Sequence, residues 1–365
     1  MNEQEITFNK ERTEIVIASN VRGAYDIPFG IHSINVRAFV NCTEMTSIHI
    51  PDSVQKIWHC AFDNCSSLTE VIIPHSVIYI GQGAFIRCSR LTSIVIKCNI
   101  KTIKEATFCG CASLKAIIIP STVNTIEAYA FSECTSLTKI ELPYNLTEIS
   151  DYLFYASGLI EFTISNRINA IGNNAFAHTQ LSSITIPSNV TSIGDELFFG
   201  CSKLTTVALP YEIKVIPKGC FQYCESLITF KFPHKLVKTG AYSFNNCKSL
   251  VSVDIPNSVE EIGEEAFSEC SKLQSLYIGE NVKYIGNNAF SRCISLAQVH
   301  LKGKIPPKVS EELANSQYTS IIENKKDIFY FTVAPLLCFV PKGAYEIYHN
   351  DKYWRNHAII EEGWL

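Results

Sequence analysis

The chain has 365 residues, of which 47% are hydrophobic and 18% charged, and its formal net charge at pH 7 is −4. The apolar share excludes a disordered chain, and the length exceeds one ordinary globular core, so we expect several domains or an extended architecture. Lys and Arg are scattered among Asp and Glu, a pattern that predicts no nucleic-acid partner and no basic membrane-binding patch.

The first segment, residues 1–24, is predicted to form an N-terminal cap. Its opening stretch MNEQEITFNKERTE is polar and does not resemble a signal peptide, and no apolar run approaches the roughly 18 residues that span a membrane. The sequence therefore predicts a cytoplasmic chain without membrane insertion, or a secreted or cell-surface chain if a leader precedes it. The stretch TEIVIAS, residues 13–19, is predicted to be a strand that covers the first coil.

Residues 25–301 repeat one pattern about twelve times with a period of 23 residues. In ten of twelve units a Cys follows a fixed Phe by three residues, and an apolar residue, usually Leu, follows three residues later. An alternating aliphatic pair and, in most units, a Pro come next. The repeated phenylalanines are Phe39, Phe62, Phe85, Phe108, Phe131, Phe154, Phe176, Phe198, Phe221, Phe244, Phe267 and Phe290.

Each part of the unit predicts a local structure. The alternating pair, such as Val71 and Ile73, indicates a short strand with one buried face, and the following Pro ends it because Pro has no N–H to donate. Glycines such as Gly81, Gly263 and Gly286 predict a tight or left-handed turn. The spacing of three between Phe, Cys and Leu favours a helical or 3₁₀ turn.

One strand and one turn cannot bury their own apolar face, but stacked coils can. Stacking places equivalent side chains in continuous internal files at the strand spacing of roughly 4.8 Å. Phe is predicted to fill the widest part of the interior, and Cys a narrow slot that takes a small, slightly polar side chain.

Fifteen cysteines permit a disulfide, metal or redox interpretation. The count is odd and most cysteines belong to the repeat, so free buried thiols are expected. The cysteines at the repeated position three residues after each Phe are called the ladder, together with those phenylalanines. Whether the cysteines outside the ladder form a disulfide stays open; these are Cys60, Cys98, Cys109, Cys220 and Cys338. Two units have Ser157 and Thr179 in place of the ladder Cys, and both are one residue shorter before their Leu.

The unit, as in IPNSVEEIGEEAFSEC and IGNNAFSRCISLAQVHL, resembles the BspA-type leucine-rich repeat. The resemblance implies an α/β repeat solenoid, a right-handed superhelix with one parallel β-sheet on the concave face, short helical or 3₁₀ turns opposite, and caps at both ends. It also implies binding of other macromolecules by surface or secreted proteins, and it brings no catalytic residues.

Residues 302–365 are predicted to hold an insertion and a C-terminal cap. Residues 302–327 are largely polar and are expected to form a loop, and DIFYFTV, residues 327–333, is expected to be a strand. The following segment resembles the end of such arrays. Its strand would carry Cys338, Val340 and Pro341, and a short helix with Tyr345, Tyr348 and Trp354 would close the array.

Motifs of catalysis are not found, so we expect neither an enzyme nor a bound cofactor or metal. His59, Cys60 and Cys65 lie close in sequence, but Cys65 belongs to the ladder and no second pair has zinc spacing. The enzymatic alternative is a site in the C-terminal cap formed by His349, Asp351 and His357.

Binding is better supported, on the outward-facing residues of the predicted concave sheet. Ile72, Val95 and Ile118, beside Ala116, form an apolar stripe in a column that elsewhere carries residues such as Lys231, Asp254 and Tyr277. The competing interpretation is that β-branched residues simply suit strands. The sequence thus predicts a non-catalytic module for protein–protein interaction, with a cell-surface or secreted adhesin or structural spacer, binding host or matrix proteins, as the alternative.

Overall fold

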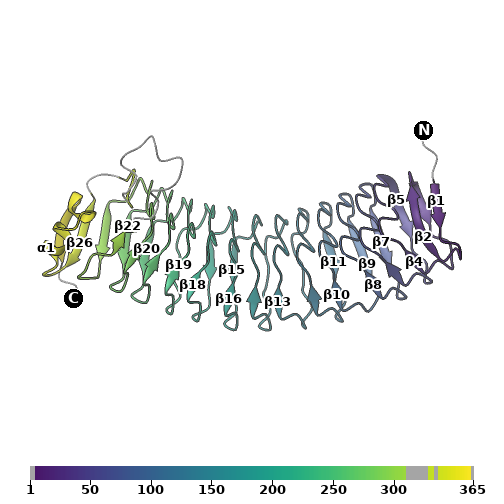
Figure 1. The fold of residues 1–365 in the computed structure, drawn as a ribbon, viewed down its shortest axis with the longest axis horizontal. Coiled ribbons are helices and arrows are strands. Elements are labelled where there is room, and N and C mark those ends of the chain that lie inside the picture. Colours follow the sequence, from purple (N-terminus) through teal and green to yellow (C-terminus); the bar gives the residue numbers. More distant parts are fainter. Residues whose placement is uncertain (1–4, 310–327, 333–335, 363–365) are drawn as a thin grey trace. The chain divides into compact units, whose positions relative to one another are not determined.

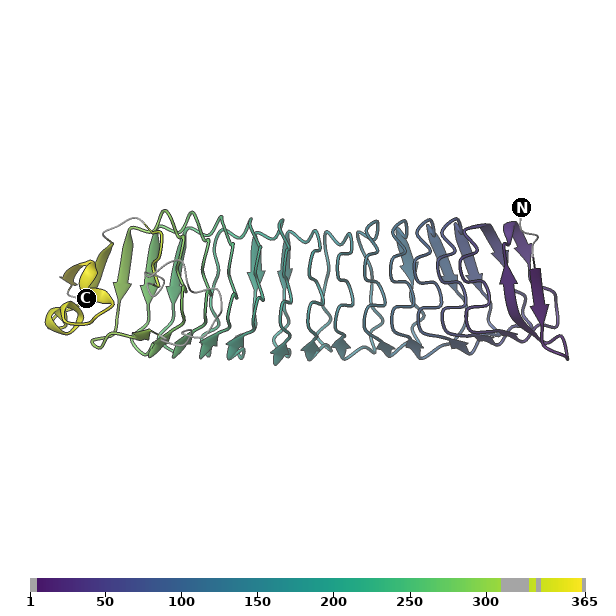
Figure 2. The same cartoon turned by 45° about the horizontal axis from the view of Figure 1, so that its top comes forward.

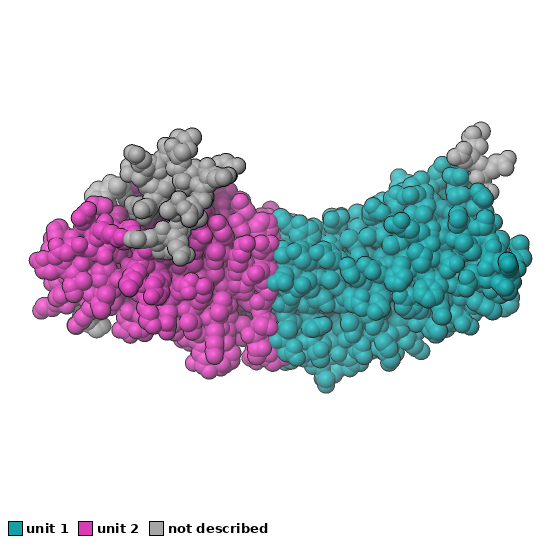
Figure 3. Space-filling view, in the orientation of Figure 1, with its two compact units in different colours: residues 1–181 teal, residues 182–365 magenta. Residues whose placement is uncertain are grey.

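Successive repeats lie against one another as coils, and the strands of neighbouring coils pair in parallel (Figure 1). The computed structural model describes residues 5–309, 328–332 and 336–362. The chain divides into unit 1, residues 1–181, and unit 2, residues 182–365 (Figure 3). Val71 pairs with Ile94, its equivalent in the next coil, so each position of the repeat forms a row of side chains within its unit.

The longer strands of unit 1 form a parallel sheet in the order β11-β9-β7-β5-β3. In β7 and β9 the exposed and buried residues alternate, as expected for a strand whose second face is covered. The strands are β3 (Arg22–Asp26), β5 (Glu44–His49), β7 (Glu70–Ile73), β9 (Ser93–Ile96) and β11 (Ala116–Ile118).

Unit 1 also has a second row of parallel strands, which the sequence did not predict (Figure 2). Most of these strands are two residues long, and their second residue, such as Ile57 or Ile80, is buried. Strand β1 (Glu5–Phe8) is antiparallel to β2, the strand expected within residues 13–19. The row comprises β2 (Glu14–Ser19), β4 (Ser33–Ile34), β6 (Lys56–Ile57), β8 (Tyr79–Ile80), β10 (Thr102–Ile103), β12 (Thr125–Ile126), β13 (Glu148–Ile149) and β14 (Ala170–Ile171).

Unit 2 repeats the two-row arrangement. Its longer strands are β15 (Ser183–Thr185), β17 (Thr206–Ala208), β20 (Ser252–Ile255), β22 (Ser275–Ile278), β24 (Gln298–Leu301), β26 (Leu337–Pro341) and β27 (Ala358–Glu362). Its short strands are β16 (Ser192–Ile193), β18 (Val215–Ile216), β19 (Lys238–Thr239), β21 (Glu261–Ile262), β23 (Tyr284–Ile285) and β25 (Lys308–Val309). The fold is therefore a β-solenoid.

The helical or 3₁₀ turns expected after each Phe are replaced by β-turns, and this part of the predicted α/β class was wrong. Hydrogen bonds do span three residues, since the Cys65 N–H donates to the Phe62 carbonyl at 3.2 Å and the Leu68 N–H to the Cys65 carbonyl at 3.0 Å. A helix is prevented because the residues two before and two after Phe62, Cys60 and Asn64, have positive φ values of 54° and 58°.

These left-handed residues direct the backbone of the turn toward the next coil. The N–H groups of Cys60, Phe62 and Asn64 donate to the carbonyls of residues 82, 84 and 86 at 2.8–2.9 Å. The left-handed conformation costs roughly 1–2 kcal/mol for a residue other than Gly. The inter-coil bonds offset this cost because the turn's N–H groups would otherwise lack partners.

The glycines that follow the short strands serve a different purpose from the one predicted. Gly81 and Gly263 are not among the residues with positive φ. A Cβ atom on Gly81 would lie 2.5 Å from the backbone nitrogen of His59, and one on Gly263 would lie 2.5 Å from the carbonyl carbon of Gly240. Glycine is required there because the backbones of two coils approach closely.

The predicted internal files are confirmed in both units. The ladder Phe rings of unit 1 stack with centroids 5.1–6.1 Å apart, from Phe39 to Phe176. Those of unit 2 stack at 5.0–5.6 Å from Phe198 to Phe290, and Phe329 adds a further ring at 5.8 Å from Phe290. All of these phenylalanines are buried.

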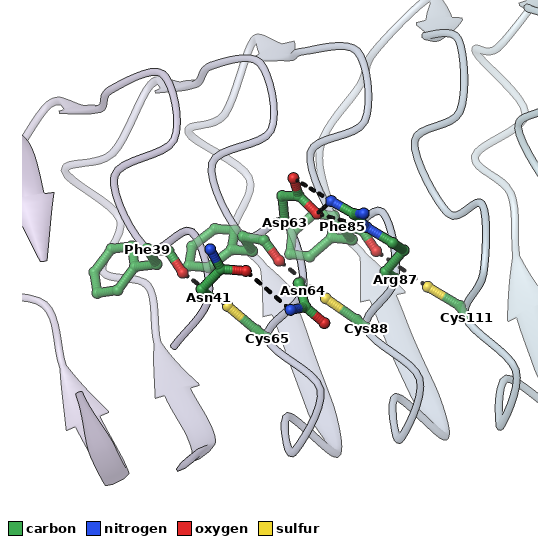
Figure 4. A network of polar contacts seen from close by, with 10 residues as sticks. Phe39, Asn41, Asp63, Asn64, Cys65, Phe85, Arg87, Cys88 and Cys111 are labelled. Carbon is green, nitrogen blue, oxygen red and sulfur yellow. Dashed lines mark hydrogen bonds and ion pairs between the residues drawn. The ribbon is translucent and has the colours of Figure 1, made fainter. Parts of the chain in front are cut away.

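The ladder cysteines do more than fill a slot, since their thiols bind the neighbouring coil. Cys88 Sγ donates to the Phe62 carbonyl at 3.2 Å, the same oxygen that accepts the Cys65 N–H. The contact recurs with a separation of 26 residues, and Figure 4 shows it for Cys65, Cys88 and Cys111. The ladder cysteines are free, as expected, and the five outside the ladder, whose pairing the sequence left open, are free as well.

The C-terminal part corrects one predicted strand. Within DIFYFTV the described residues Ile328–Thr332 form a turn, in which Phe329 stacks on Phe290 at 5.8 Å. Strand β26 contains the expected Cys338, and helix α1 (Tyr345–His349) follows it. A 3₁₀ helix, η1 (Trp354–Asn356), and the unpredicted strand β27 complete the segment. The loop predicted for residues 302–327 lies mostly outside the described residues.

Candidate interaction surfaces

The predicted apolar stripe exists as a patch on the longer-strand sheet of unit 1. Val95 of β9 pairs with Ile72 of β7 on one side and with Ile118 of β11 on the other. The three side chains are 51%, 45% and 85% exposed, for Ile72, Val95 and Ile118 respectively. Ala116 is also exposed and pairs with Ser93. The structure thus brings four of the predicted site residues together.

A groove adjoins this stripe at the ends of the longer strands. Its volume is about 690 Å³, and Ile72 is one of the residues that line it. Phe29, which follows β3 and is 86% exposed, lines it as well. Charged and titratable groups surround the two apolar side chains, among them Asp26, His75 and Lys97. Phe29 was not predicted as a site residue because it lies in a loop before the first full repeat.

The remaining predicted site residues lie in unit 2 and form a different surface. Asp254 of β20 pairs with Tyr277 of β22, and the Asp254 carboxylate binds Lys302 Nζ at 3.2 Å. Lys231 is exposed but lies in residues 228–232, where the longer-strand row has no strand. Only Asp254 and Tyr277 are therefore neighbours.

Tyr277 begins an aromatic stack that the repeat pattern did not reveal. Its ring lies 4.4 Å from the ring of His300, which in turn lies 4.5 Å from the ring of Phe339. All three occupy paired outward positions on β22, β24 and β26. His300 Nδ1 lies 3.4 Å from Glu362 Oε2, and the imidazole is buried. This stack occupies the same outward strand position that carries the exposed aliphatic residues Ile72, Val95 and Ile118 in unit 1.

On the turns of unit 1, Asp63, which directly follows the ladder residue Phe62, forms an ion pair with Arg87 of the next turn. The buried Asp63 carboxylate accepts hydrogen bonds from Arg87 Nη2 at 2.7 and 2.8 Å and from Nε at 3.1 Å (Figure 4). Asp63 is the main cause that raises the pKa of the Arg87 guanidinium. In the same turns Asn64 Nδ2 donates to Asn41 Oδ1 at 2.9 Å.

The thiols are held in their protonated form. Burial raises the pKa of the thiols of Cys134, Cys224 and Cys247 above the usual value. A thiolate, the reactive and metal-binding form of Cys, is therefore disfavoured in the ladder. Within the described ranges, no group of three or more His, Cys, Asp or Glu side chains is arranged to hold a metal ion.

The residues of the enzymatic alternative have structural contacts. The Asp351 carboxylate accepts hydrogen bonds from the backbone N–H groups of Tyr353 and Trp354, at 2.8 and 3.3 Å. His357 packs edge-on against Phe329 with centroids 5.4 Å apart, and His349 stacks on Tyr345 at 5.2 Å. These contacts order the C-terminal segment.

Comparison with protein families identifies the repeat. The model of the BspA type leucine-rich repeat region matches residues 23–126, 101–228 and 191–317, which overlap to cover most of the chain. The chain belongs to this family of BspA type leucine-rich repeat proteins. A comparison with curated proteins gives no match.

Solved structures share the fold. A leucine-rich repeat protein from Bacteroides ovatus is 27% identical, with a TM-score of 0.67, and the alignment covers 85% of this chain and 98% of that chain. A leucine-rich cell surface protein from Faecalibacterium prausnitzii is 24% identical, with a TM-score of 0.50 and coverages of 82% and 93%. The pneumococcal vaccine antigen PcpA is 17% identical, with a TM-score of 0.56 and coverages of 99% and 97%.

Membrane insertion through a helix finds no support in the described part of the chain. None of the helices there is long and apolar enough to cross a bilayer.

Proposed function

We propose that this leucine-rich-repeat protein is a non-catalytic binding module that receives a protein partner on the longer-strand sheet of unit 1. The observation that carries the proposal is the row of Ile72, Val95 and Ile118. These are three aliphatic side chains in register on adjacent strands, each about half or more exposed. Contiguous exposed apolar surface on a soluble protein marks an interaction site more often than scattered apolar residues do.

The surroundings of the stripe favour a protein as the ligand. An aliphatic centre with a polar rim is typical of protein–protein interfaces. The adjoining groove supplies such a rim through Asp26, His75 and Lys97, and it adds Phe29 as an exposed aromatic side chain. Aromatic anchors contribute strongly to such interfaces when they become buried.

Two features set this surface apart from the same column in unit 2. There Asp254 is paired with Lys302, and Tyr277 and His300 are stacked on one another. Their apolar area is already partly covered within the protein. The exposed aliphatic row of unit 1 would contribute more free energy to binding a partner, because burying exposed apolar surface contributes roughly 25 cal/mol per Å².

The experiment compares proteins captured by the wild-type chain and by the double variant Val95→Asp with Ile118→Asp. Quantitative mass spectrometry of bound proteins should show a set that is lost from the variant, because two carboxylates would have to be desolvated at the centre of the interface. The matched control is Thr185→Asp with Ala208→Asp, which changes the paired outward positions of β15 and β17 in unit 2.

The expected result is loss from the stripe variant alone, followed by direct binding of the purified candidate with the same preference. Capture of the same proteins in equal amounts by all three chains would contradict the proposal. Matrix proteins such as fibrous host proteins belong among the candidates, since the adhesin alternative predicts binding of that class through the same surface.

A further inference from the structure

The turns of unit 2 enclose a polar pocket that is separate from the strand surface described above. Its volume is about 480 Å³, within the range of roughly 300–1,000 Å³ that is typical of small-ligand sites. It lies along the turns that follow the ladder residues Phe221, Phe244, Phe267 and Phe290. In the equivalent turns of unit 1, Arg87 donates hydrogen bonds to the Asp63 carboxylate.

The floor of the pocket is a row of amide and hydroxyl groups. The residues directly after the four ladder phenylalanines are Gln222, Asn245, Ser268 and Ser291, and all four line the pocket. Ser268 Oγ and Ser291 Oγ are hydrogen-bonded at 2.9 Å. Because neighbouring coils lie about 4.8 Å apart, the floor presents polar groups at regular intervals.

Asn245 supplies an unused hydrogen-bond donor to this floor. Its side chain oxygen accepts from Gln222 Nε2 at 3.3 Å and from Asn246 Nδ2 at 2.9 Å. The residue is only 5% exposed, yet its own Nδ2 makes no hydrogen bond to any residue that the structure describes. This Nδ2 is not among the fully buried side-chain atoms without a partner, so it is accessible from the pocket and can donate to a ligand that accepts hydrogen bonds.

The walls combine tyrosine rings with charged groups. Tyr223, Tyr242 and Tyr330 line the pocket, together with Glu265 and the Arg292–Glu269 ion pair, whose Nη1–Oε1 distance is 2.7 Å. Burial is the main cause that raises the pKa of the Glu265 carboxyl, followed by the neighbouring Glu264. The pocket thus offers ring faces, hydrogen-bond donors and hydrogen-bond acceptors side by side.

The chemistry of the lining selects the class of ligand. Among the described residues that line the pocket there is no aliphatic or Phe side chain. A lipid tail or an aliphatic peptide anchor would find no apolar contact there except the tyrosines. A ligand that is neutral, rich in hydroxyls and flat on one face would meet both the amide floor and the Tyr rings.

We infer that this pocket, built on Asn245 and Tyr242 in the turns of unit 2, binds a short neutral saccharide. The saccharide's hydroxyl oxygens accept from the Asn245 amide and its O–H groups donate to the neighbouring carboxylates, while a sugar ring lies against tyrosine. The site is independent of the protein-binding stripe in unit 1.

The test is saturation-transfer-difference NMR on the full chain with four disaccharides, namely cellobiose, maltose, lactose and N,N′-diacetylchitobiose. At least one should show transfer to its ring protons. Asn245→Ser should weaken that binding about fivefold, because one hydrogen bond is lost. This variant is compatible with the fold, since Ser268 and Ser291 occupy the same position in the next two turns.

Tyr242→Ala should also weaken binding, whereas the matched control Tyr152→Ala should not. Tyr152 precedes its ladder Phe by two residues in unit 1, as Tyr242 does in unit 2, and both residues have φ values between 54° and 59°. Absence of transfer from all four disaccharides overturns the inference. So does transfer that is unchanged in both pocket variants, or stronger transfer from a Gly-Ser peptide used as the competing ligand.

Discussion

The ladder Phe position carries the same residue throughout units 1 and 2, whereas the outward positions differ. Phe62 and Phe85 stack at 5.1 Å in unit 1, and Phe244 and Phe267 stack at 5.0 Å in unit 2. On the outside, however, exposed Val95 of unit 1 corresponds to the half-buried Tyr277 of unit 2. Stacking therefore constrains the interior, because each ring must fit against an identical neighbour, and leaves the exterior free to specialise.

The turns show the same contrast. In unit 1 the carboxylate of Asp63 is fully occupied by Arg87, while in unit 2 the equivalent Asn245 keeps one donor unused. The backbone of both turns is alike, with φ values of 58° at Asn64 and 60° at Asn246. One backbone thus supports a closed ion pair in one unit and an open pocket in the other.

The largest loss of stability is expected when one ladder Phe ring is removed from each unit. This tests whether the interiors of the two units are packed equally tightly. Phe85→Ala and Phe244→Ala should each lower the free energy of unfolding by about 3–5 kcal/mol, because both rings are buried between two others. Urea unfolding followed by circular dichroism measures this. A loss below 1 kcal/mol in either unit would show that its file is not tightly packed.

Loss of the thiol contact to the preceding coil should lower the stability by a smaller amount. Cys134→Ala removes the hydrogen bond from Sγ to the Phe108 carbonyl, 3.2 Å long, and leaves a small cavity, so we expect a loss of about 2 kcal/mol. Cys134→Ser keeps a donor and should lose less. Urea midpoints of the two variants provide the comparison, and equal midpoints would show that the thiol acts by packing alone.

Stability should also fall at alkaline pH. Burial raises the folded-state pKa of Cys134 above its unfolded value, so the stabilisation is fully present below the unfolded pKa of about 8.5. It is lost as pH rises above that value, by at most about 1.4 kcal/mol per pH unit for each thiol. Urea unfolding with reductant at pH 7–10 measures the loss.

Cys134→Ser supplies the control for this titration, since a Ser hydroxyl does not ionise in this range. Its stability should decline less steeply with pH than that of the wild-type chain. Identical slopes would mean that Cys134 contributes nothing to the alkaline loss.

The smallest change in stability is expected from substitutions on the outward face of the longer-strand sheet. Val95→Asp with Ile118→Asp should change the free energy of unfolding by less than about 1 kcal/mol, because both side chains are exposed in the folded protein. The measurement is again a urea midpoint, compared with Thr185→Asp with Ala208→Asp. A much larger loss would indicate that the stripe is needed for folding, and the binding experiment would then need single variants.

The sequence alone identified the features that repeat. Twelve phenylalanines in fixed phase predicted an internal file, and the matching Ile and Val pairs predicted strands with one buried face. It also placed Ile72, Val95 and Ile118 side by side, because a parallel register of equal units follows directly from an equal period.

Features that depend on contacts between coils were decided only by the tertiary structure. The thiol of Cys88 reaches a carbonyl 26 residues earlier, and Asn64 adopts a positive φ so that its N–H meets the next coil. Neither contact leaves a local signal, because spacing within one unit does not reveal which backbone atoms the neighbouring unit presents. The pocket around Asn245 likewise arises from four turns at once, whereas a sequence pattern describes one turn at a time.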